Sequence, residues 1–430
     1  MGGLRFVARA ATIAWFLFFR GFVWFFGWLA RLVSFRGKAS RQAWFAQCLL
    51  ALLRDLGATF IKVGQIMSTR PDLLPPHIIH ALETLQDRVG PFAFKHVERT
   101  LREDFGSGPE TLFAEFDPVP TATASVAQVH KARLHDGTAV AVKVRRPRIE
   151  RIAELDLSFM RLVARMIALI PSYRLLAPLE SVNEFGRGLA MQLDLSREAE
   201  SNRRFAASFA ADPDVFFPKL HPELCSRRVL TMEWIDGVKV LQFEKVGADP
   251  ARLARIGFRV LLKMVFQDGF VHADLHPGNI FVTPGNHKVC LLDLGLTGEL
   301  DDLHRRAFAQ YFAAWASCDG ATMAKIMHDL SPSAGKVPDY PAFERAVSTF
   351  VARYQGKKLG EVEVATVAYE MMEILRTHRV RVNATFTMCN IAIAITEGIG
   401  KQLDPSIDLM AEALPFFATL DFGAPVVNRS

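Results

Sequence analysis

Apolar positions change their spacing along the chain, and each change predicts a different kind of element. Between residues 46 and 85 they recur at helical spacing, with breaks at Arg70-Pro71 and Pro75-Pro76. Between 116 and 146 apolar and polar residues alternate as in strands. There Asp136-Gly137 separates two alternating runs, which is a strong hairpin signal. A helical region is therefore expected to precede a β-rich one.

The pattern returns to helix over residues 150–210, where Leu155, Phe159, Leu162 and Met166 share one helical face. A second strand pair is expected within 215–241, which contains another Asp-Gly. From Pro250 onward helices dominate, apart from short strands around 280–282 and 289–292. The pattern predicts an α+β protein with a β-rich lobe, a helical lobe, and extra helices before and within the first.

Residues 6–35 form an aromatic segment with regularly spaced arginines. It holds eleven aromatic residues, and Arg9, Arg20 and Arg31 recur every 11 positions. At about 100° per helical residue, a step of 11 returns to within about 20° of the same face. The segment therefore predicts a helix with a basic stripe, which Arg5 extends.

Such a helix can lie in a bilayer interface, with its rings buried and its guanidinium groups near anionic headgroups. The alternatives are a spanning helix and a helix packed on the protein's own core. A spanning helix would place Arg20 near mid-bilayer, which costs about 2.5–3.5 kcal/mol of insertion free energy. A signal peptide is disfavoured because no small-residue cleavage site follows the apolar run. We expect attachment within one leaflet.

Charge and cysteine content narrow the class of protein. The net charge is +6, but residues 1–50 alone hold seven basic residues and no acidic one. The rest of the chain is close to neutral, which argues against a nucleic-acid surface there. The five cysteines lie far apart without C-x-x-C, so neither a disulfide framework nor a zinc site is expected.

The richest chemistry lies in FVHADLHPGNIFV at 270–282 and LLDLG at 291–295. One interpretation is a metal site made of His272, Asp274 and His276. The other is a phosphoryl-transfer loop, in which Asp274 orients the nucleophile while Asn279 and Asp293 hold Mg²⁺. Hard oxygen ligands suit Mg²⁺, and the spacing favours the second interpretation.

A phosphoryl-transfer enzyme also needs groups that hold the nucleotide. Ala141-Val142-Lys143 follows the hairpin, where kinases place the lysine that binds the α- and β-phosphates. Glu198 is the best candidate for its ion-pair partner, with Glu184 and Glu200 as rivals. Met232-Glu233-Trp234-Ile235 fits a hinge whose backbone binds adenine, through Glu233 and Ile235.

The expected phosphate loop, TATASVAQV at 121–129, contains no glycine. Alanine lacks glycine's freedom at positive φ, so this loop is expected to be stiffer than an ordinary kinase loop. We expect nucleotide contacts from its nine residues, Thr121, Ala122, Thr123, Ala124, Ser125, Val126, Ala127, Gln128 and Val129.

The sequence resembles the UbiB/ABC1 family of atypical kinase-like proteins, also called ADCK or AarF, and the bacterial members most closely. The resemblance rests on K-x-G-Q at Lys62-Val63-Gly64-Gln65, the Ala-rich loop, LQDRV at 85–89, and FVHADLHPGN, and it spans about residues 50–410. It implies an atypical protein-kinase-like two-lobed fold with an N-terminal helical extension. Lys62 and Gln65 join the active site on this resemblance alone.

The resemblance further implies binding and slow hydrolysis of ATP with Mg²⁺, in support of ubiquinone or another isoprenoid-quinone pathway. It implies contact with a membrane lipid or quinone precursor, and with other quinone-biosynthesis proteins. The expected location is the cytoplasmic face of the bacterial inner membrane. Two departures stand out. The family's E-x-D appears as Gln192-Leu193-Asp194, and the last apolar run, ALPFFATL, is too short for the family's C-terminal membrane hairpin.

We therefore expect four regions. They are a membrane-associating helix at 1–45, a helical extension carrying K-x-G-Q at 46–115, an N-lobe at 116–236 and a helical C-lobe at 237–430. Two other functions stay open. One is a small-molecule kinase of the aminoglycoside or choline type, whose loop also reads H-x-D-x-H-P-x-N. The other is a nucleotide-sensing scaffold without turnover.

Overall fold

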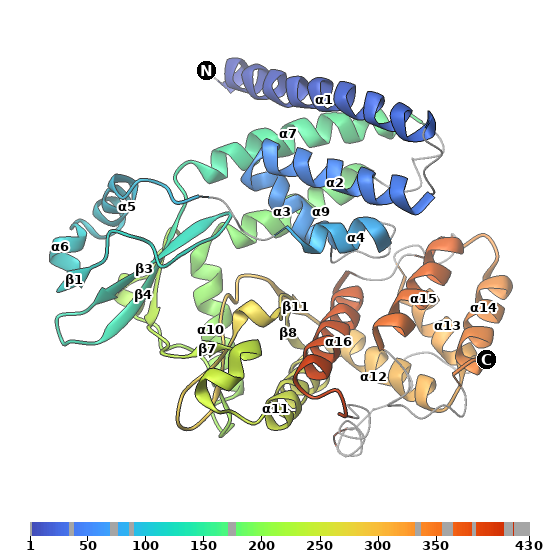
Figure 1. Ribbon diagram of the computed structural model, residues 1–430. Helices are drawn as coiled ribbons and strands as arrows, with labels where there is room; N and C mark the ends of the chain where they lie inside the picture. The colour runs from blue at the N-terminus through green and yellow to red at the C-terminus, as the bar shows by residue number, and fades with distance from the viewer. Residues whose placement is uncertain are drawn as a thin grey trace. The chain divides into compact units, whose positions relative to one another are not determined.

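A computed structural model of the chain is shown in Figure 1. It describes residues 2–33, 38–68, 76–85, 90–170, 178–331, 337–354, 364–380, 384–407 and 416. The chain forms two compact units. The first takes its residues from Met1–Ser68, Leu74–Glu200 and Lys219–Trp234, and the second mainly from Ser201–Pro218 and Ile235–Ser430.

The first unit contains an antiparallel sheet in the order β1-β3-β4-β6, with β2 also paired to β3. The strands are β1 (Glu115–Phe116), β2 (Ala122–Thr123), β3 (Ala127–Arg133), β4 (Ala139–Arg145) and β6 (Val229–Glu233). Asp136-Gly137 joins β3 to β4, which confirms the predicted hairpin, and Gly137 takes φ +90°.

The two faces of β4 are buried against different partners. Val140, Val142 and Val144 pack with Val97 and Leu101 of α5 (Lys95–Phe105). Because side chains alternate along a strand, Lys143 lies on the opposite face. The short helix α6 (Pro109–Leu112) follows α5.

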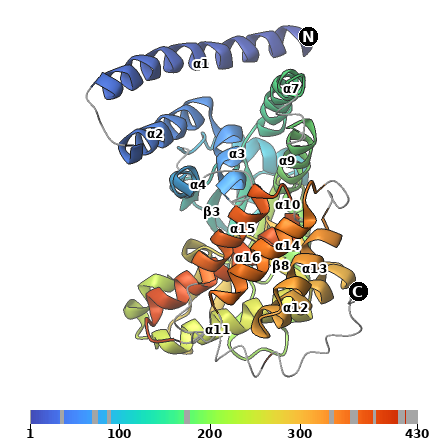
Figure 2. The same cartoon turned by 90° about the vertical axis from the view of Figure 1, so that its right-hand side faces the viewer.

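Helices make up the rest of the first unit. They are α1 (Gly2–Val33), α2 (Lys38–Leu56), α3 (Ala58–Ser68), α4 (Pro76–Glu83), α7 (Ile149–Ile167) and α9 (Pro178–Gln192), and α10 (Leu195–Ser208) begins in it. Figure 2 shows α2, α3 and α4 as neighbours. The extra helices predicted before and within the β-rich region are confirmed.

Gly64, the glycine of K-x-G-Q, is set against three buried leucines. A Cβ added there would lie 2.3 Å from Leu85 Cδ1, 3.0 Å from Leu53 Cδ1 and 3.3 Å from Leu82 Cδ2. Leu53 belongs to α2 and Leu82 to α4, so the missing side chain lets α3 approach both helices.

We predict that Gly64→Ala lowers the free energy of unfolding by about 1–3 kcal/mol, because the leucines must move to admit the methyl group. Gly188→Ala in α9 is the matched control, since a Cβ there meets no atom within 4 Å. Gly188→Ala should raise the free energy of unfolding by up to about 1 kcal/mol, because alanine has a higher helix propensity than glycine. Urea denaturation measures both, and equal effects of the two variants would disprove the packing argument.

Two arginines of the basic stripe of α1, Arg9 and Arg20, face the protein. Arg9 pairs with Asp156 of α7, Nε to Oδ1 at 2.6 Å, and donates to the carbonyl of Leu56 at 2.8 Å. Arg20 Nε lies 2.7 Å from Asp55 Oδ2 of α2. The expectation that Arg9 and Arg20 contact lipid headgroups is therefore wrong. Acidic side chains distant in sequence bind them, and no helical periodicity could reveal this.

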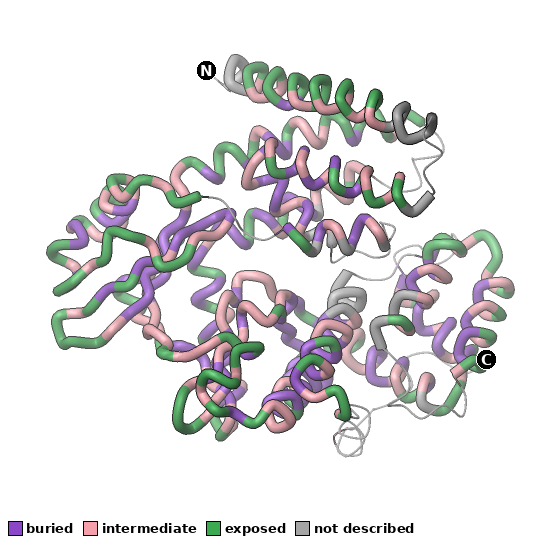
Figure 3. Tube along the Cα trace, in the orientation of Figure 1, coloured by how far each residue is buried: buried purple, intermediate pink, exposed green. Residues whose placement is uncertain are grey.

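The other side of α1 is exposed (Figure 3). Ile13 is buried, and Phe16 and Trp24 pack beside it against α2 and α4. Six aromatic side chains of α1 are exposed, with Phe18 71% exposed, and three apolar residues beside them are exposed as well. These outward residues, named here the aromatic face of α1, are Val7, Trp15, Leu17, Phe18, Phe19, Phe22, Val23, Phe25 and Phe26.

The second unit holds two small sheets. One has the order β5-β10-β9-β7, from β5 (Val215–Phe216), β7 (Val238–Lys239), β9 (Ile280–Val282) and β10 (Val289–Leu291). The other pairs β8 (Phe270–His272) with β11 (Thr297–Glu299). The strands predicted around 280–282 and 289–292 are confirmed.

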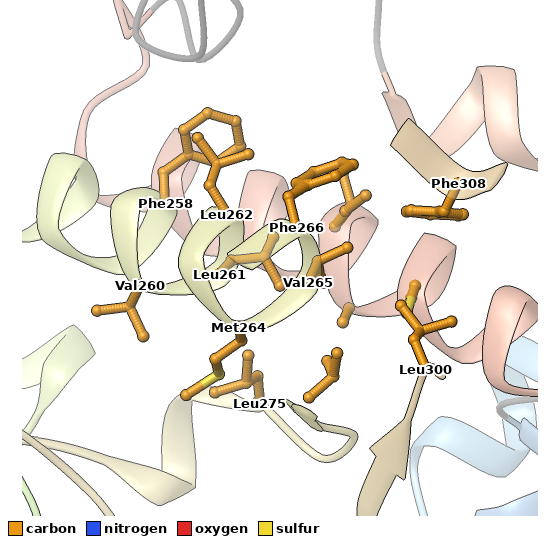
Figure 4. Close-up of a cluster of buried hydrophobic side chains, with 14 of the residues drawn as sticks. Phe258, Val260, Leu261, Leu262, Met264, Val265, Phe266, Leu275, Leu300 and Phe308 are labelled. Carbon is orange, nitrogen blue, oxygen red and sulfur yellow. The ribbon is translucent and has the colours of Figure 1, made fainter. Parts of the chain in front are cut away.

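The helices of the second unit surround one apolar core. They are α11 (Pro250–Leu262), α12 (Asp302–Ala316), α13 (Gly320–Asp329), α14 (Tyr340–Ala352), α15 (Val364–Thr377) and α16 (Ala384–Leu403). The second unit also contains three short helical turns, η2 (Val240–Val246), η3 (Lys263–Gln267) and η4 (Pro277–Asn279). A further short turn, η1 (Pro222–Leu224), belongs to the first unit. In Figure 4 the end of α11 and η3 pack Leu261, Val265 and Phe266 beside Leu300 and Phe308. This core supports β8, whose end carries the HADLHPGN loop.

The strand pair predicted around the second Asp-Gly is wrong. β6 pairs with β4 of the first unit, whereas β7 pairs with β9 of the second. Asp236-Gly237 therefore lies where the chain passes from one unit to the other. The glycine lets the backbone at position 237 lie close to the backbone of Val282, because a Cβ on Gly237 would be 2.9 Å from the carbonyl oxygen of Val282.

Candidate active site

Lys143 and Glu198 form a buried ion pair in the first unit. Lys143 Nζ donates to Glu198 Oε1 at 2.9 Å and Oε2 at 2.8 Å, and both residues are buried. β4 places the lysine on the sheet face away from α5, and the first turn of α10 supplies the glutamate. A carboxylate in the first turn also suits the helix dipole. Of the rivals, Glu200 is exposed, and the side chain of Glu184 lies outside the described residues.

Asp194 caps the start of α10 just before that glutamate. It accepts from Ser196 N at 3.1 Å and Ser196 Oγ at 2.6 Å, and from Arg227 Nε at 2.9 Å. Burial raises the pKa of its carboxyl group, but the hydrogen bonds from Ser196 and Arg227 together outweigh this and leave the pKa below its usual range. Asp194 therefore holds the helix that carries Glu198.

Gln192 stands where the family's E-x-D has a glutamate. Its amide oxygen and nitrogen are both buried and have no hydrogen-bond partner in the described part of the chain. In the same described part, no group of three or more His, Cys, Asp or Glu side chains is placed to hold a metal ion. Gln192 carries no charge, and both carboxylate oxygens of Asp194 already accept hydrogen bonds, Oδ1 from Ser196 and Oδ2 from Arg227.

The Ala-rich loop is a short closed turn. Thr121 N donates to Val129 O and Ala124 N to Ala127 O, both at 2.8 Å. The side chains from Ser125 to Gln128 are buried, and Gln128 Oε1 accepts from Phe92 N at 3.0 Å. Contacts of this loop with a nucleotide would therefore come from its backbone and from the exposed end at Thr121 and Ala122.

Arg146 is a positioning residue that the sequence analysis missed. Its guanidinium donates to Ala124 O at 3.2 Å and to Gly90 O at 2.7 Å, and its backbone N–H to Val126 O at 2.8 Å. It thus holds the Ala-rich loop at two points. The available signal was the pair Arg145-Arg146 at the end of the strand that carries Lys143.

Lys62 and Gln65 lie on α3, beside the Ala-rich loop. Ala58 and Val63 of α3 join Val126 and Ala127 of the loop in one apolar cluster, with α7 and α9. Gln65 Nε2 donates to Leu85 O at 3.0 Å, and Lys62 is half-buried. The K-x-G-Q helix and the loop therefore belong to one apolar cluster, which α7 and α9 complete.

In the second unit, His272 is a scaffold for the HADLHPGN loop. It is fully buried, and burial lowers the pKa of its imidazole, which is therefore neutral. Nε2–H donates to Leu292 O at 3.1 Å and Nδ1 accepts from Asp274 N at 3.1 Å. Because both ring nitrogens are used, His272 is not a metal ligand, which removes the His272-Asp274-His276 interpretation.

Asn279 is hydrogen-bonded to Asp274 and to Leu292, the residue before Asp293. Asn279 Nδ2 donates to Asp274 O at 3.1 Å, and Leu292 N donates to Asn279 O at 2.9 Å. Because the amide nitrogen is used in this way, the amide oxygen is the atom with which Asn279 would bind a metal ion. Asp293 has φ +55°, an uncommon conformation for a residue other than glycine that clusters at functional sites. Carboxylate and amide oxygens fit Mg²⁺.

The proposed hinge lies where the chain leaves the first unit. Glu233 pairs with Val140 across β6 and β4, and its N–H donates to Lys219 O at 2.8 Å. Trp234 N donates to Ala139 O at 3.0 Å. The division between the units falls between Trp234 and Ile235.

Comparison with known proteins agrees with this arrangement. Residues 84–327 match the model of the ABC1 atypical kinase-like domain, and residues 347–408 match the UbiB helical domain. The chain belongs to the UbiB/ABC1 family. A UbiB protein of Aeromonas hydrophila, named probable protein kinase, is 36% identical over 402 residues, which cover 91% of this chain and 73% of the relative.

A second UbiB relative, from Vibrio atlanticus, is 35% identical over 85% of this chain and 69% of its own length. A solved structure of Rv3197 with erythromycin, from Mycobacterium tuberculosis, matches with a TM-score of 0.54 and 22% identity. The match covers 83% of this chain and 92% of that one. This likeness shows the shared fold, and the α+β, kinase-like architecture in two lobes is confirmed.

Proposed function

We propose that this UbiB-family protein is an atypical kinase or ATPase that binds and slowly hydrolyses Mg·ATP. The observation that carries the proposal is the buried Lys143–Glu198 ion pair on the strand and helix where a kinase-like fold needs it. The oxygen-rich loop of Asp274, Asn279 and Asp293 supports it.

Each residue has a proposed role in that reaction. Lys143, oriented by Glu198, binds the phosphates, and the backbone of Glu233 and Ile235 binds adenine. Asp274 orients a water or a hydroxyl acceptor. Asn279 and Asp293 would hold Mg²⁺, which supplies positive charge opposite the negative charge that develops on the γ-phosphoryl group. Lys62 and Gln65, beside the Ala-rich loop, limit access and so keep turnover slow.

Membrane association is proposed through α1. The stretch Phe6–Gly27 is long and apolar enough to cross a membrane by length and composition. However, α1 is attached to the rest of the first unit through Arg9, Ile13 and Arg20. This attachment favours a helix that lies in the membrane interface with its aromatic face in lipid. We further propose a role in quinone biosynthesis at the cytoplasmic face of the inner membrane, with a lipid or quinone precursor as ligand; membership of the UbiB family supports this proposal.

We predict that Asp274→Asn lowers phosphate release from Mg·ATP by about 10²–10⁴-fold, because the amide cannot take the proton. Liposomes should raise the wild-type rate. Asp302→Asn is the matched control, since that side chain is 86% exposed, and it should leave the rate unchanged.

Three other outcomes would redirect the proposal. Tight ATP binding without release by the wild type would indicate a nucleotide-sensing scaffold. Transfer of labelled phosphate to small hydroxylated acceptors would indicate a small-molecule kinase. Wild-type rates in Asp274→Asn would remove this aspartate from the mechanism.

A further inference from the structure

The second half of α7 exposes an apolar face that the mechanism does not use. Leu162 is 45% exposed, Met166 62% and Leu169, just past the end of the helix, 82%. Val163, Ile167 and Ile170 are exposed as well. We name these six residues the α7 apolar face. Together with the aromatic face of α1, they account for most of the exposed large apolar side chains among the described residues.

This face continues a stripe whose first half is covered. Phe159 packs with Met160 against the cluster of α1, α2 and α4, and Asp156 binds Arg9. One turn further on, Leu162 and Met166 of the same stripe have no such cover. The spacing of Leu155, Phe159, Leu162 and Met166 predicts a helix face that is buried along its whole length. The second half of this face, at Leu162 and Met166, is exposed instead.

The charges around the face suit an anionic lipid surface. From Leu157 to Ile170 the only charged residues are Arg161 and Arg165. Arg161 Nε donates to Asn183 Oδ1 at 2.9 Å, and Arg165 is exposed. Apolar side chains flanked by arginine and free of acids are typical of interfacial helices, whereas rigid complementary packing is typical of protein interfaces.

The α7 apolar face is continuous with the helix already assigned to the membrane. α1 and α7 are in contact and are joined by the Arg9–Asp156 pair. Both views show α1 lying next to α7 at one edge of the first unit (Figures 1 and 2). These contacts join the N-terminal part of α1 to the first half of α7, so a bilayer that receives the aromatic face of α1 is expected to reach α7 as well.

We propose that the α7 apolar face is a second lipid-contacting element, which enters the membrane interface beside α1. This proposal rests on the proposed membrane association of α1. It makes the attachment two-sited, so that the first unit is held to the bilayer by two helices and cannot rotate about α1.

The test is co-sedimentation of the full chain with vesicles of phosphatidylcholine containing phosphatidylglycerol. Met166→Glu should lower the vesicle partition coefficient by about tenfold or more, because a charge then replaces an inserted side chain. Ser158→Glu is the matched control: it adds the same charge at an exposed position of α7 outside the face and should bind as the wild type. Phe22→Glu reports on α1.

The outcomes separate this inference from the proposed function. Wild-type binding by Met166→Glu together with loss in Phe22→Glu overturns the α7 element and leaves membrane attachment standing. No binding by the wild type itself refutes the attachment through α1. A change of oligomeric state in Met166→Glu without loss of vesicle binding makes the face a protein interface and also overturns the inference.

A second measurement avoids substitution. Hydrogen exchange of the wild type should slow at residues 162–170 when the vesicles are added, as amides at a helix end become shielded from water. Unchanged exchange there, with slowing in α1, would contradict the proposal even if the Met166 variant failed to fold.

Discussion

Replacing Lys143 with methionine is expected to lower the free energy of unfolding by about 3–5 kcal/mol and to abolish stabilisation by Mg·ATP. The lysine and Glu198 are both buried, and their two hydrogen bonds, of 2.8 and 2.9 Å, hold the carboxylate. Without the ammonium group, Glu198 keeps its charge in a dry environment or takes up a proton. Either costs stability.

A double variant separates the structural role from the functional one. Lys143→Met with Glu198→Gln removes both charges, so much of the lost stability should return, while nucleotide binding should not. Urea denaturation gives the stability, and the shift of melting temperature on adding Mg·ATP gives the binding. If the double variant regained ATP binding, Lys143 would not be a phosphate ligand.

Replacing Arg9 with alanine is expected to lower the free energy of unfolding by about 3 kcal/mol or to detach α1 from the first unit. The reason is that the side chain of Asp156 is 0% exposed and would lose its bound guanidinium group. Arg20→Ala is the matched control on the same helix. The side chains of Arg20 and Asp55 are 34% and 28% exposed, so loss of this ion pair should lower the free energy of unfolding by no more than about 1 kcal/mol.

Denaturation in mild detergent and the rate of proteolysis within α1 measure these two effects. Adding Asp156→Asn to Arg9→Ala should restore part of the stability, since the uncompensated charge disappears. Equal effects of Arg9→Ala and Arg20→Ala would show that burial of Asp156 does not matter. For the same reason, deletion of residues 1–45 tests membrane attachment poorly, because it also leaves Asp156 without Arg9.

Local sequence was sufficient for elements and motifs whose signal lies within a few residues. The Asp136-Gly137 hairpin was predictable because a tight turn that needs a positive φ selects glycine, here Gly137, and joins strands that pair with each other. The order of Lys143, Asp274, Asn279 and Asp293 indicated a kinase-like fold, because that chemistry needs those groups in that sequence of elements.

The second Asp-Gly shows where the local signal fails. The same dipeptide at 236–237 lies between strands of two different units, and its glycine is needed for contact with the Val282 carbonyl. A turn signal reports a permitted backbone conformation. It does not report which strand the next segment will pair with, because that depends on packing far away in sequence.

The sequence by itself determined the family, the kinase-like order of motifs and the presence of an aromatic, arginine-bearing helix. The sequence also named Glu198 as the best partner for Lys143, and the structure pairs these two residues. Only the tertiary structure decided the partners of the arginines on that helix: Asp156 for Arg9 and Asp55 for Arg20, which were expected to face lipid. Helical and strand periods state which side chains share a face. Which residue meets that face is set by long-range packing, and with it whether an arginine binds lipid or its own fold.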